Sequence, residues 1–455
     1  MLHTSPIDEP GTKDAGGMNV VVRAQAEELA RLGHRVRLIT RRSAPDQPAE
    51  VELMPGLSVV HLAAGPARVL PKGDHEALIA PFGAALADHL SERPADLIHA
   101  EHWYSGLAAL PYARAAGVPL VQSYHSIAAD ESTPLTEGER PEAAGRLEGE
   151  RRLAREADLV VTVSEAERDT VLGRLGGDPA RVAVVHPGVD TAVFRPRVPA
   201  DQEHDPARAR HKDHDADADY GDDADHGGDE PRGVEEHVGA DLAGADPGVR
   251  GVHDTSAPIE DRQARRTAAA ADARPEVLVV GRLDPLKGFD LAIAAVASIA
   301  EAHRPRLGII GAPPPDGDAY VRALHEAAAA SDMGNTVAFA GALGRPALAE
   351  RMREAALVLI PSHSETFGLV ALEAAASGVP VVARATGGLL EAVVDGETGL
   401  LVSGDDPATW AAAIERVLRE PELAERMRVA ARQRALARSW EASTRELLAA
   451  YRSVI

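Results

Sequence analysis

The sequence predicts an α/β fold of two doubly wound, Rossmann-like domains that face a central cleft. Three observations lead to this prediction. The chain has 455 residues, which is too long for one ordinary core at about 100 to 200 residues per domain. Short apolar runs alternate with segments of helical periodicity, and they do so in two separate series. Such alternation is typical of parallel sheets covered by helices.

The first series predicts an N-terminal domain over residues 1–195. Between Val20 and Ala100 a helical segment is followed by the run VRLIT, a second helix and the run DLIHA. The alternation continues through VPLVQSYH, a charged helix around Glu142 to Glu156, DLVVTVS and RVAVVHPGVD. We therefore expect a parallel sheet in this domain.

The second series predicts a C-terminal domain over residues 274–438. It begins at EVLVVGRLD and passes through LAIAAVASIAEA, RLGIIGA, VRALHEAAAA, TVAFAGAL and LVLIPS. An Ala-rich helix after Phe367 and the run VPVVARATGG complete it. A charged helix around Glu422 to Ala437 precedes a final helix from Trp440. That final helix (440–455) could cap the second domain, but we expect it to pack back onto the first.

A low-complexity segment, residues 199–273, separates the two series. Between Asp201 and Asp261 it has 19 acidic and 5 basic residues, and it is rich in Asp, His, Ala and Gly. Because it offers few apolar side chains to bury, we predict that it is disordered. Its Asp-x-Asp triplets suggest a metal site, but ligands without a scaffold bind weakly, so we predict none.

The composition excludes several classes of protein. A formal net charge of -23 argues against binding of nucleic acid, which needs a basic face. The chain has no cysteine, and this removes disulfides, thiolate zinc sites and cysteine nucleophiles. No run approaches the roughly 20 apolar residues of a membrane span, and the N-terminus lacks the pattern of a secretory signal. We predict a cytoplasmic protein without stable membrane insertion.

The most specific motif is HSETFGLVALEAAASGVPVVA, from His363 to Ala383, which follows a predicted strand and leads into a helix. Glu365 and Glu373 could be the carboxylate pair of a glycosidase. However, eight helical residues rise about 12 Å, beyond the roughly 5 to 9.5 Å that such pairs need. We therefore interpret Glu365 as a partner for sugar hydroxyls and Glu373 as a clamp for a ribose diol. Further donors for ligand oxygens are the amides of Phe367, Gly368 and Leu369.

A second motif, GRLDPLKG, follows the first strand of the second domain. Arg282 and Lys287 extend from a turn that Gly281 and Pro285 shape. Ligands bind at the carboxyl ends of the strands in open parallel sheets. Two cations at such a place can neutralise a diphosphate leaving group without a metal ion.

A third motif, PGTKDAGGMN, is predicted to lie between the first strand and the first helix of the N-terminal domain. Gly16 and Gly17 allow the backbone to approach a phosphate or a sugar closely. The helix that begins near Met18 points its positive end toward the same ligand.

Taken together and in this order, the three motifs resemble those of the retaining glycosyltransferases of family four, which have the GT-B fold. The likeness covers the whole chain except the acidic segment. PGTKDAGGMNVVV is most similar to the mycothiol-pathway D-inositol-3-phosphate glycosyltransferases. The resemblance implies transfer of N-acetylglucosamine from its uridine diphosphate ester to an inositol phosphate, by front-face substitution with retention. It implies a nucleotide diphosphate-sugar as co-substrate and no required cofactor or metal.

The resemblance also implies roles for individual residues. His125 joins Arg282, Lys287 and Glu365 at the reacting centre, and Leu343 joins the donor-binding residues. The residues implied for the acceptor are Asn19, Lys72, His102, Ser126 and Arg146. Two departures concern the acceptor: relatives have an aromatic residue in place of His102, and a lysine where this chain reads YHSIAADES.

Two alternatives stay open at this point. One is a relative with another donor, such as guanosine diphosphate-mannose, that acts on a glycan or lipid. The other is a catalytically silent protein that binds nucleotide sugars. The expected partners are a nucleotide-sugar donor and a small-molecule acceptor, with a homodimer as a further expectation.

Overall fold

The structure is a computed structural model that describes residues 1–8, 16–70, 72–128, 143–197, 274–314, 317–331, 333 and 336–455. The predicted disordered segment, with its Asp-x-Asp triplets, lies outside these residues. So does most of the third motif, up to Ala15, and Lys72 is described by its backbone alone.

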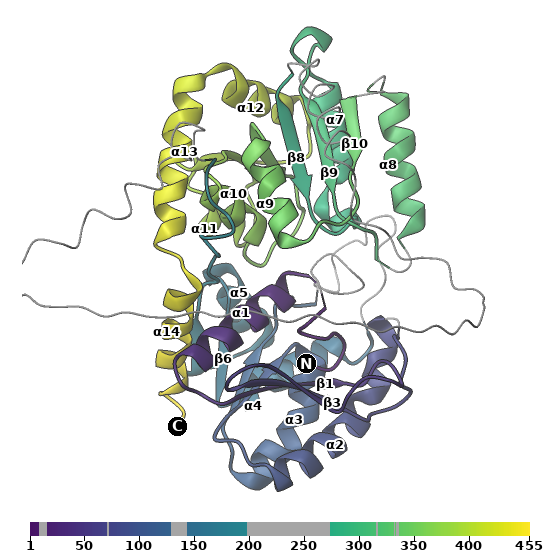
Figure 1. The fold of residues 1–455 in the computed structure, drawn as a ribbon, viewed down its shortest axis with the longest axis vertical. Coiled ribbons are helices and arrows are strands. Elements are labelled where there is room, and N and C mark those ends of the chain that lie inside the picture. Colours follow the sequence, from purple (N-terminus) through teal and green to yellow (C-terminus); the bar gives the residue numbers. More distant parts are fainter. Residues whose placement is uncertain are drawn as a thin grey trace, which may run out of the picture. The chain divides into compact units, whose positions relative to one another are not determined.

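The N-terminal half, residues 1–197, combines eight short segments of helix with seven strands within its described residues (Figure 1). In chain order they are α1 (Gly17–Arg31), β1 (Val36–Arg41), β2 (Glu50–Met54), β3 (Leu57–Leu62), η1 (Lys72–Leu78), α2 (Ile79–Glu92), β4 (Ile98–Glu101), α3 (Trp103–Ala116), β5 (Leu120–Ser123), α4 (Arg146–Glu156), β6 (Leu159–Thr162), α5 (Glu165–Thr170), η2 (Val171–Leu175), η3 (Pro179–Arg181) and β7 (Val182–Val184).

These strands form two sheets rather than one. The first has the order β1-β3-β2 and the second β4-β5-β6-β7. All pairs are parallel except β2 with β3. The parallel sheet expected in this domain is therefore interrupted by β2, a half-exposed edge strand with a weak apolar pattern. The strand expected before α1 is also absent from the described residues 1–8. Between the sheets, the Met1 ammonium donates to the Ile39 carbonyl at 2.7 Å and the Leu2 amide to Ser105 Oγ at 3.0 Å.

The C-terminal half, residues 274–455, is a regular doubly wound domain followed by two helices. Its elements are β8 (Glu276–Val280), η6 (Pro285–Lys287), α7 (Phe289–Ala297), η7 (Glu301–His303), β9 (Arg306–Ile310), α8 (Asp318–Ala330), β10 (Val337–Phe339), α9 (Arg345–Glu354), β11 (Leu357–Ile360), α10 (Leu369–Ala376), β12 (Val381–Arg384), α11 (Leu389–Ala392), β13 (Gly399–Val402), α12 (Pro407–Arg419), α13 (Pro421–Leu436) and α14 (Trp440–Tyr451).

The six strands of this half are all parallel, in the order β10-β9-β8-β11-β12-β13. Strand order reverses between β8 and β11, and crevices at such a switch point bind ligands. Alternate residues of β8 enter two different cores. Val277 and Val279 pack with α7 and α12, whereas Leu278 packs with α9 and α10. Helices therefore cover both faces, which explains the continuous apolar strands.

Two segments connect the halves. Phe194, from the stretch after β7, is fully buried in a core of the C-terminal half. In the other direction, α14 packs on α1, where Gln25 Nε2 donates to Ser443 Oγ at 3.3 Å. Leu447 of α14 is buried in a small core with Val121 of β5.

Candidate active site

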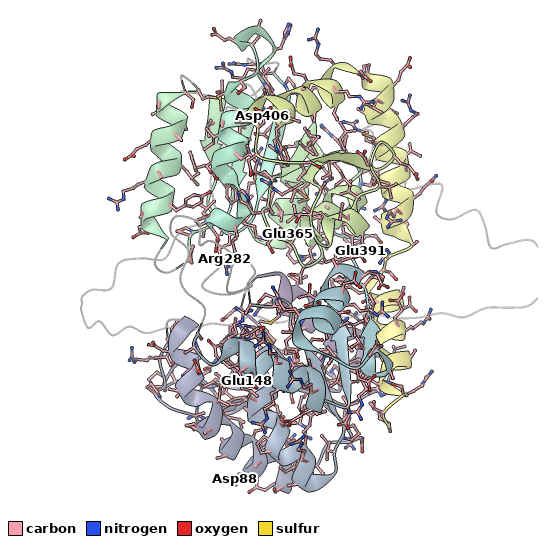
Figure 2. All side chains as sticks on the ribbon, turned by 180° about the vertical axis from the view of Figure 1, so that it is seen from behind. Asp88, Glu148, Arg282, Glu365, Glu391 and Asp406 are labelled. Atoms are coloured by element: carbon pink, nitrogen blue, oxygen red, sulfur yellow. The ribbon has the colours of Figure 1, made fainter. Side chains whose placement is uncertain are left out.

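The predicted cations and carboxylates gather on the loops that follow β8 and β11. Figure 2 shows Arg282, Glu365 and Glu391 along one edge of the C-terminal half. The β8 loop approaches β11 so closely that a Cβ on Gly288 would lie 2.5 Å from the Pro361 carbonyl oxygen. Gly288 has φ 66°, a conformation that glycine adopts at little cost. This contact places Lys287 beside Glu365.

Both predicted cations have carboxylate partners. Lys287 Nζ lies 2.6 Å from Glu365 Oε1, and Ser362 Oγ donates to the same oxygen at 3.0 Å. Arg282 Nη2 lies 3.2 Å from Asp284 Oδ2. The other oxygen of Asp284 accepts the Leu286 amide and so caps the η6 turn. A diphosphate that bound here would therefore compete with these carboxylates for the two cations.

Glu373 lies on α10 and is 5% exposed. Arg345 Nη1 at the start of α9 donates to Glu373 Oε1 at 2.7 Å. Burial raises the pKa of the Glu373 carboxyl, while the Arg345 charge and hydrogen bond oppose that rise. The carboxylate assigned to a ribose diol is thus already held by a cation that the sequence reasoning missed.

The other donor-binding residues lie at the starts of α10 and α1. Gly368 caps α10 with φ 100°, and Phe367 is buried beside it. A Cβ on Gly17 would lie 3.2 Å from Leu369 Cδ1, which puts the beginning of α1 against α10. Gly281, which begins the β8 loop, and Leu343, which packs against the adjoining core, are half-buried.

In the N-terminal half, His125 is bonded to a carboxylate at the end of the neighbouring strand. Its Nε2 lies 2.6 Å from Glu101 Oε2. Burial alone would lower the pKa of His125, but the charge and hydrogen bond of Glu101 raise it above the ordinary value. Burial alone would raise the pKa of Glu101, whereas His99 and His125 hold it at about 2. Each group of the pair therefore favours the ionised form of the other.

This pair continues to the final helix. His99 Nε2 contacts Ser123 Oγ at 2.9 Å and lies 3.7 Å from Glu101 Oε1, and His99 Nδ1 contacts the Tyr451 hydroxyl at 2.6 Å. Burial lowers the pKa of His99 below the ordinary histidine value, and the charge of Glu101 opposes this effect. A chain of polar contacts thus links α14 to His125.

Two residues have strained backbones. His102 and His125 have φ 70° and 59°, and among the described residues no other non-glycine residue has a positive φ. His102 directly follows the end of β4, and His125 lies two residues beyond the end of β5. Strain of this kind costs about 1 to 3 kcal/mol and is concentrated at functional sites. The His102 ring is 3% exposed and lies against the rings of His3 and Tyr104.

Two of the residues implied for the acceptor support the local backbone. Arg146 Nη2 donates to the carbonyl and the hydroxyl of Ser126, at 3.0 and 3.1 Å. Its Nε donates at 2.8 Å to Glu150, which is fully buried. Asn19 donates to Ser5 O and Thr4 Oγ1 and accepts the Gly16 amide, which fixes the start of α1.

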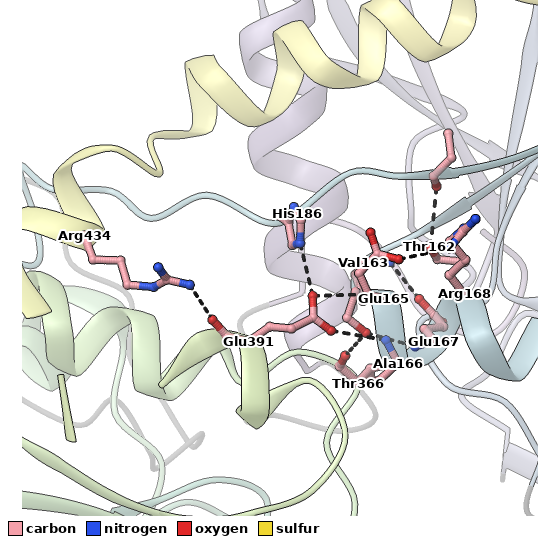
Figure 3. A network of polar contacts seen from close by, with 12 residues as sticks. Thr162, Val163, Glu165, Ala166, Glu167, Arg168, His186, Thr366, Glu391 and Arg434 are labelled. Atoms are coloured by element: carbon pink, nitrogen blue, oxygen red, sulfur yellow. Dashed lines mark hydrogen bonds and ion pairs between the residues drawn. The ribbon is translucent and has the colours of Figure 1, made fainter. Parts of the chain in front are cut away.

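Side-chain contacts join the loops of the two halves (Figure 3). Thr366 Oγ1 donates to the His125 carbonyl at 2.8 Å, and Ser164 Oγ donates to the Thr366 carbonyl at 2.7 Å. Because Thr366 directly follows Glu365, these bonds bring the β11 loop to the end of β5. The sequence reasoning missed Thr366, although it lies inside the most specific motif.

Glu391 of α11 makes a second set of contacts between the halves (Figure 3). Its carboxylate accepts the amides of Glu165 and Ala166, both at 3.1 Å, and contacts His186 Nε2 at 3.1 Å. A carboxylate at the beginning of a helix is favourable because the free amides there carry partial positive charge. Arg434 of α13 donates to the Glu391 carbonyl at 2.7 Å.

Two family models match the chain. Residues 15–193 match Glycosyltransferase Family 4, and residues 260–434 match Glycosyl transferases group 1. The chain belongs to glycosyltransferase family four. A D-inositol 3-phosphate glycosyltransferase of Kineococcus radiotolerans is 36% identical over 100% of this chain and 94% of that protein. The enzyme of the same name from Frankia alni is 36% identical over 100% of this chain and 98% of that protein.

Solved structures show the same fold. Sucrose-phosphate synthase from Thermosynechococcus elongatus is 26% identical, with a TM-score of 0.77 over 100% of this chain and 97% of that one. Anabaena Alr3699/HepE in complex with UDP and glucose is 19% identical, with a TM-score of 0.67 over 98% of each chain. The predicted GT-B fold is confirmed, and this glycosyltransferase has two Rossmann-like halves, with two sheets in the first half and one in the second.

Two further findings concern the described residues alone. They contain no group of three or more His, Asp or Glu side chains arranged to hold a metal ion. None of their helices has the length and apolar character needed to span a bilayer.

Proposed function

We propose that this glycosyltransferase transfers N-acetylglucosamine from UDP-N-acetylglucosamine to a small phosphorylated acceptor such as 1D-myo-inositol 3-phosphate, with retention of configuration and without a metal. The observation that carries the proposal is the full-length likeness to D-inositol 3-phosphate glycosyltransferases, at 36% identity. The contacts of the candidate site are consistent with it. Cytoplasmic location and self-association stay predictions.

In the proposed mechanism, the C-terminal half binds the donor. The Glu373 carboxylate accepts both hydroxyls of the ribose. Lys287 transfers part of its hydrogen bonding from Glu365 to the diphosphate, and Arg282 does the same from Asp284. Both cations then face the oxygens that gain charge as the sugar leaves, which stabilises the transition state. Glu365, partly released, accepts a hydroxyl of the sugar.

The N-terminal half supplies the acceptor side. The acceptor hydroxyl attacks the anomeric carbon on the face from which the diphosphate departs, and its proton passes to a departing phosphate oxygen. Protonated His125 has Nε2 committed to Glu101, so Nδ1 is the atom that donates to a substrate oxygen. The Thr366 bond to the His125 carbonyl supports this arrangement, because it joins the loop that carries Glu365 to the backbone of His125.

A panel of donors and acceptors tests the proposal. UDP-N-acetylglucosamine, UDP-glucose and GDP-mannose are each incubated with the protein, with and without 1D-myo-inositol 3-phosphate, and released nucleoside diphosphate is measured. We expect release from UDP-N-acetylglucosamine that depends on the acceptor, and release that is about 30- to 1000-fold slower from Arg282→Ala. Release from GDP-mannose alone would favour the alternative donor. Nucleotide binding without release in any combination would indicate a silent binding protein.

A further inference from the structure

Arg345 connects the carboxylate assigned to the ribose with the segment that joins the two halves. Its Nη1 lies 2.7 Å from Glu373 Oε1. Its guanidinium carbon lies 4.8 Å from the centre of the Phe194 ring. Glu373 and Phe194 are both buried, at 5% and 0% exposure. The guanidinium is thus fixed on one side by an ion pair and on the other by a cation–π contact.

The chemistry of a ribose diol explains why this cation matters. A diol donates two hydrogen bonds, and an ionised carboxylate offers two acceptor oxygens, whereas a protonated carboxyl loses acceptor capacity. Burial disfavours the ionised form. In the part of the chain that the structure describes, Arg345 is the charged group that acts on Glu373, and it opposes the effect of burial on the pKa.

Arg345 does not use the full hydrogen-bonding capacity of the Glu373 carboxylate. Arg345 contacts Oε1, and a carboxylate oxygen has more than one acceptor site. The Phe194 ring limits where the guanidinium can go, and Arg432 Nη1 holds the Phe194 carbonyl at 3.2 Å. Arg345 is therefore held beside Glu373 by two contacts, with 27% of its side chain exposed.

We propose that Arg345 is a positioning residue of the nucleotide site, which keeps Glu373 ionised and oriented to accept the two hydroxyls of a nucleotide ribose. This inference rests on the proposed function, because that function assigns Glu373 to the ribose. Arg345 acts through Glu373 and makes no contact with the nucleotide itself. The inference predicts that substitutions of Arg345 and Glu373 have non-additive effects on nucleotide affinity. It also predicts that the affinity of an Arg345 variant depends on pH differently from that of the wild type.

The test measures nucleoside diphosphate affinity by calorimetry across the pH range. The probe is whichever of UDP, GDP and ADP the wild type binds most tightly. Arg345→Ala should weaken binding about 10-fold or more near neutral pH, the usual scale for a lost charged hydrogen bond. Its affinity should recover as pH rises, because Glu373 without a cation ionises only at higher pH. The pH below which binding is lost should therefore be higher in Arg345→Ala than in the wild type, with Arg345→Lys in between.

Two further variants separate coupling from a structural effect. In the Glu373→Gln background, Arg345→Ala should change affinity by less than about twofold, since the residue through which it acts is neutral. Arg353→Ala is the matched control. It removes an arginine of the same helix that donates to the Val193 carbonyl at 3.1 Å, and it should leave nucleotide affinity and its pH profile unchanged.

The outcomes distinguish the inference from the function on which it rests. If Glu373→Gln leaves nucleotide affinity intact, the ribose assignment fails, and the inference fails with it. If Glu373→Gln weakens binding but Arg345→Ala does not, the inference alone is overturned. It is also overturned if Arg345→Ala weakens binding equally at every pH and equally in both backgrounds, since that would indicate direct contact or a general loss of structure.

Discussion

Glu101 and His125 form a 2.6 Å hydrogen bond across the carboxyl ends of two adjacent parallel strands. Neither residue is a neighbour of the other in sequence, and each is about one-tenth exposed. The bond commits Nε2 of His125, so Nδ1 is the nitrogen to which the proposed mechanism assigns the substrate contact. Thr366 holds the same histidine by its backbone, so the ring and the main chain are fixed from different halves of the molecule.

This pair predicts the titration of His125. Removing the carboxylate charge in Glu101→Gln leaves burial and the nearby groups His99, Glu167 and the N-terminal ammonium, so the pKa of His125 should fall below its wild-type value. Two-dimensional NMR of histidine ring carbons measures the shift. His34→Gln, at an exposed position, is a control for assignment and should leave the His125 curve unchanged. An unmoved His125 curve in Glu101→Gln would contradict the electrostatic account.

The same pair predicts how stability depends on pH. The raised pKa of His125 stabilises the fold below the ordinary histidine value of 6.5 and loses its effect as pH rises through the raised value. The lowered pKa of Glu101 stabilises the fold above 4.5 and loses its effect as pH falls toward about 2. The difference in unfolding free energy between wild type and Glu101→Gln should therefore be largest between these two ordinary values. Denaturant titrations at pH 3, 5.5 and 9 measure this difference in unfolding free energy. A difference that is smaller at pH 5.5 than at pH 3 or 9 would contradict the account.

Arg282 and Glu373 are predicted to fail in different ways. Arg282→Ala should lower kcat, because it removes about 2 to 4 kcal/mol of transition-state stabilisation. The diphosphate gains charge only as the bond breaks. Glu373→Gln should instead raise the donor KM and weaken nucleotide binding, because a ribose contact exists in both ground and transition states. Steady-state kinetics with calorimetry separates the two. An Arg282→Ala variant altered only in KM would show that this residue binds without assisting departure.

Substitutions of Arg146 and Lys72 are predicted to have different effects, on the free energy of unfolding and on the acceptor KM respectively. Arg146→Ala removes the 2.8 Å contact of Nε with the buried Glu150 carboxylate, and loss of one partner of a buried ion pair costs about 3 to 5 kcal/mol. Lys72→Ala should raise KM for a phosphorylated acceptor. Chemical denaturation and acceptor kinetics on both variants test this. Equal stability of Arg146→Ala and wild type would mean that the buried pair contributes little, and an unchanged acceptor KM in Lys72→Ala would remove that residue from the acceptor site.

Chelation is predicted to leave turnover unchanged. The reason is chemical, since the proposed mechanism assigns to Arg282 and Lys287 the two positive charges that a divalent ion would otherwise bring to the diphosphate. Initial rates with and without EDTA test it. Loss of activity on chelation, restored by Mg²⁺ or Mn²⁺, would require a metal in the mechanism.

Much of the fold could be predicted because the signals are local. Strands such as β8 and β11 are short apolar runs followed by turn motifs, and the helices between them have the right periodicity. Strand β2 was not predicted because it is half-exposed at a sheet edge. The contacts of the site are different in kind. Lys287 and Glu365 are 78 residues apart, and Arg345 and Glu373 are 28 apart. No local pattern specifies such pairs, since they depend on which loops the sheet order brings together.

The central claim is retaining transfer of N-acetylglucosamine to an inositol phosphate. The most direct measurement is proton NMR of the product formed from UDP-N-acetylglucosamine and 1D-myo-inositol 3-phosphate, recorded during the first turnovers. The donor is α-linked, so retention predicts an acceptor-linked sugar whose anomeric proton shows the small coupling of an α-glycoside. A large coupling, which marks a β-glycoside, would contradict front-face substitution. Free N-acetylglucosamine in place of a linked product would contradict the acceptor.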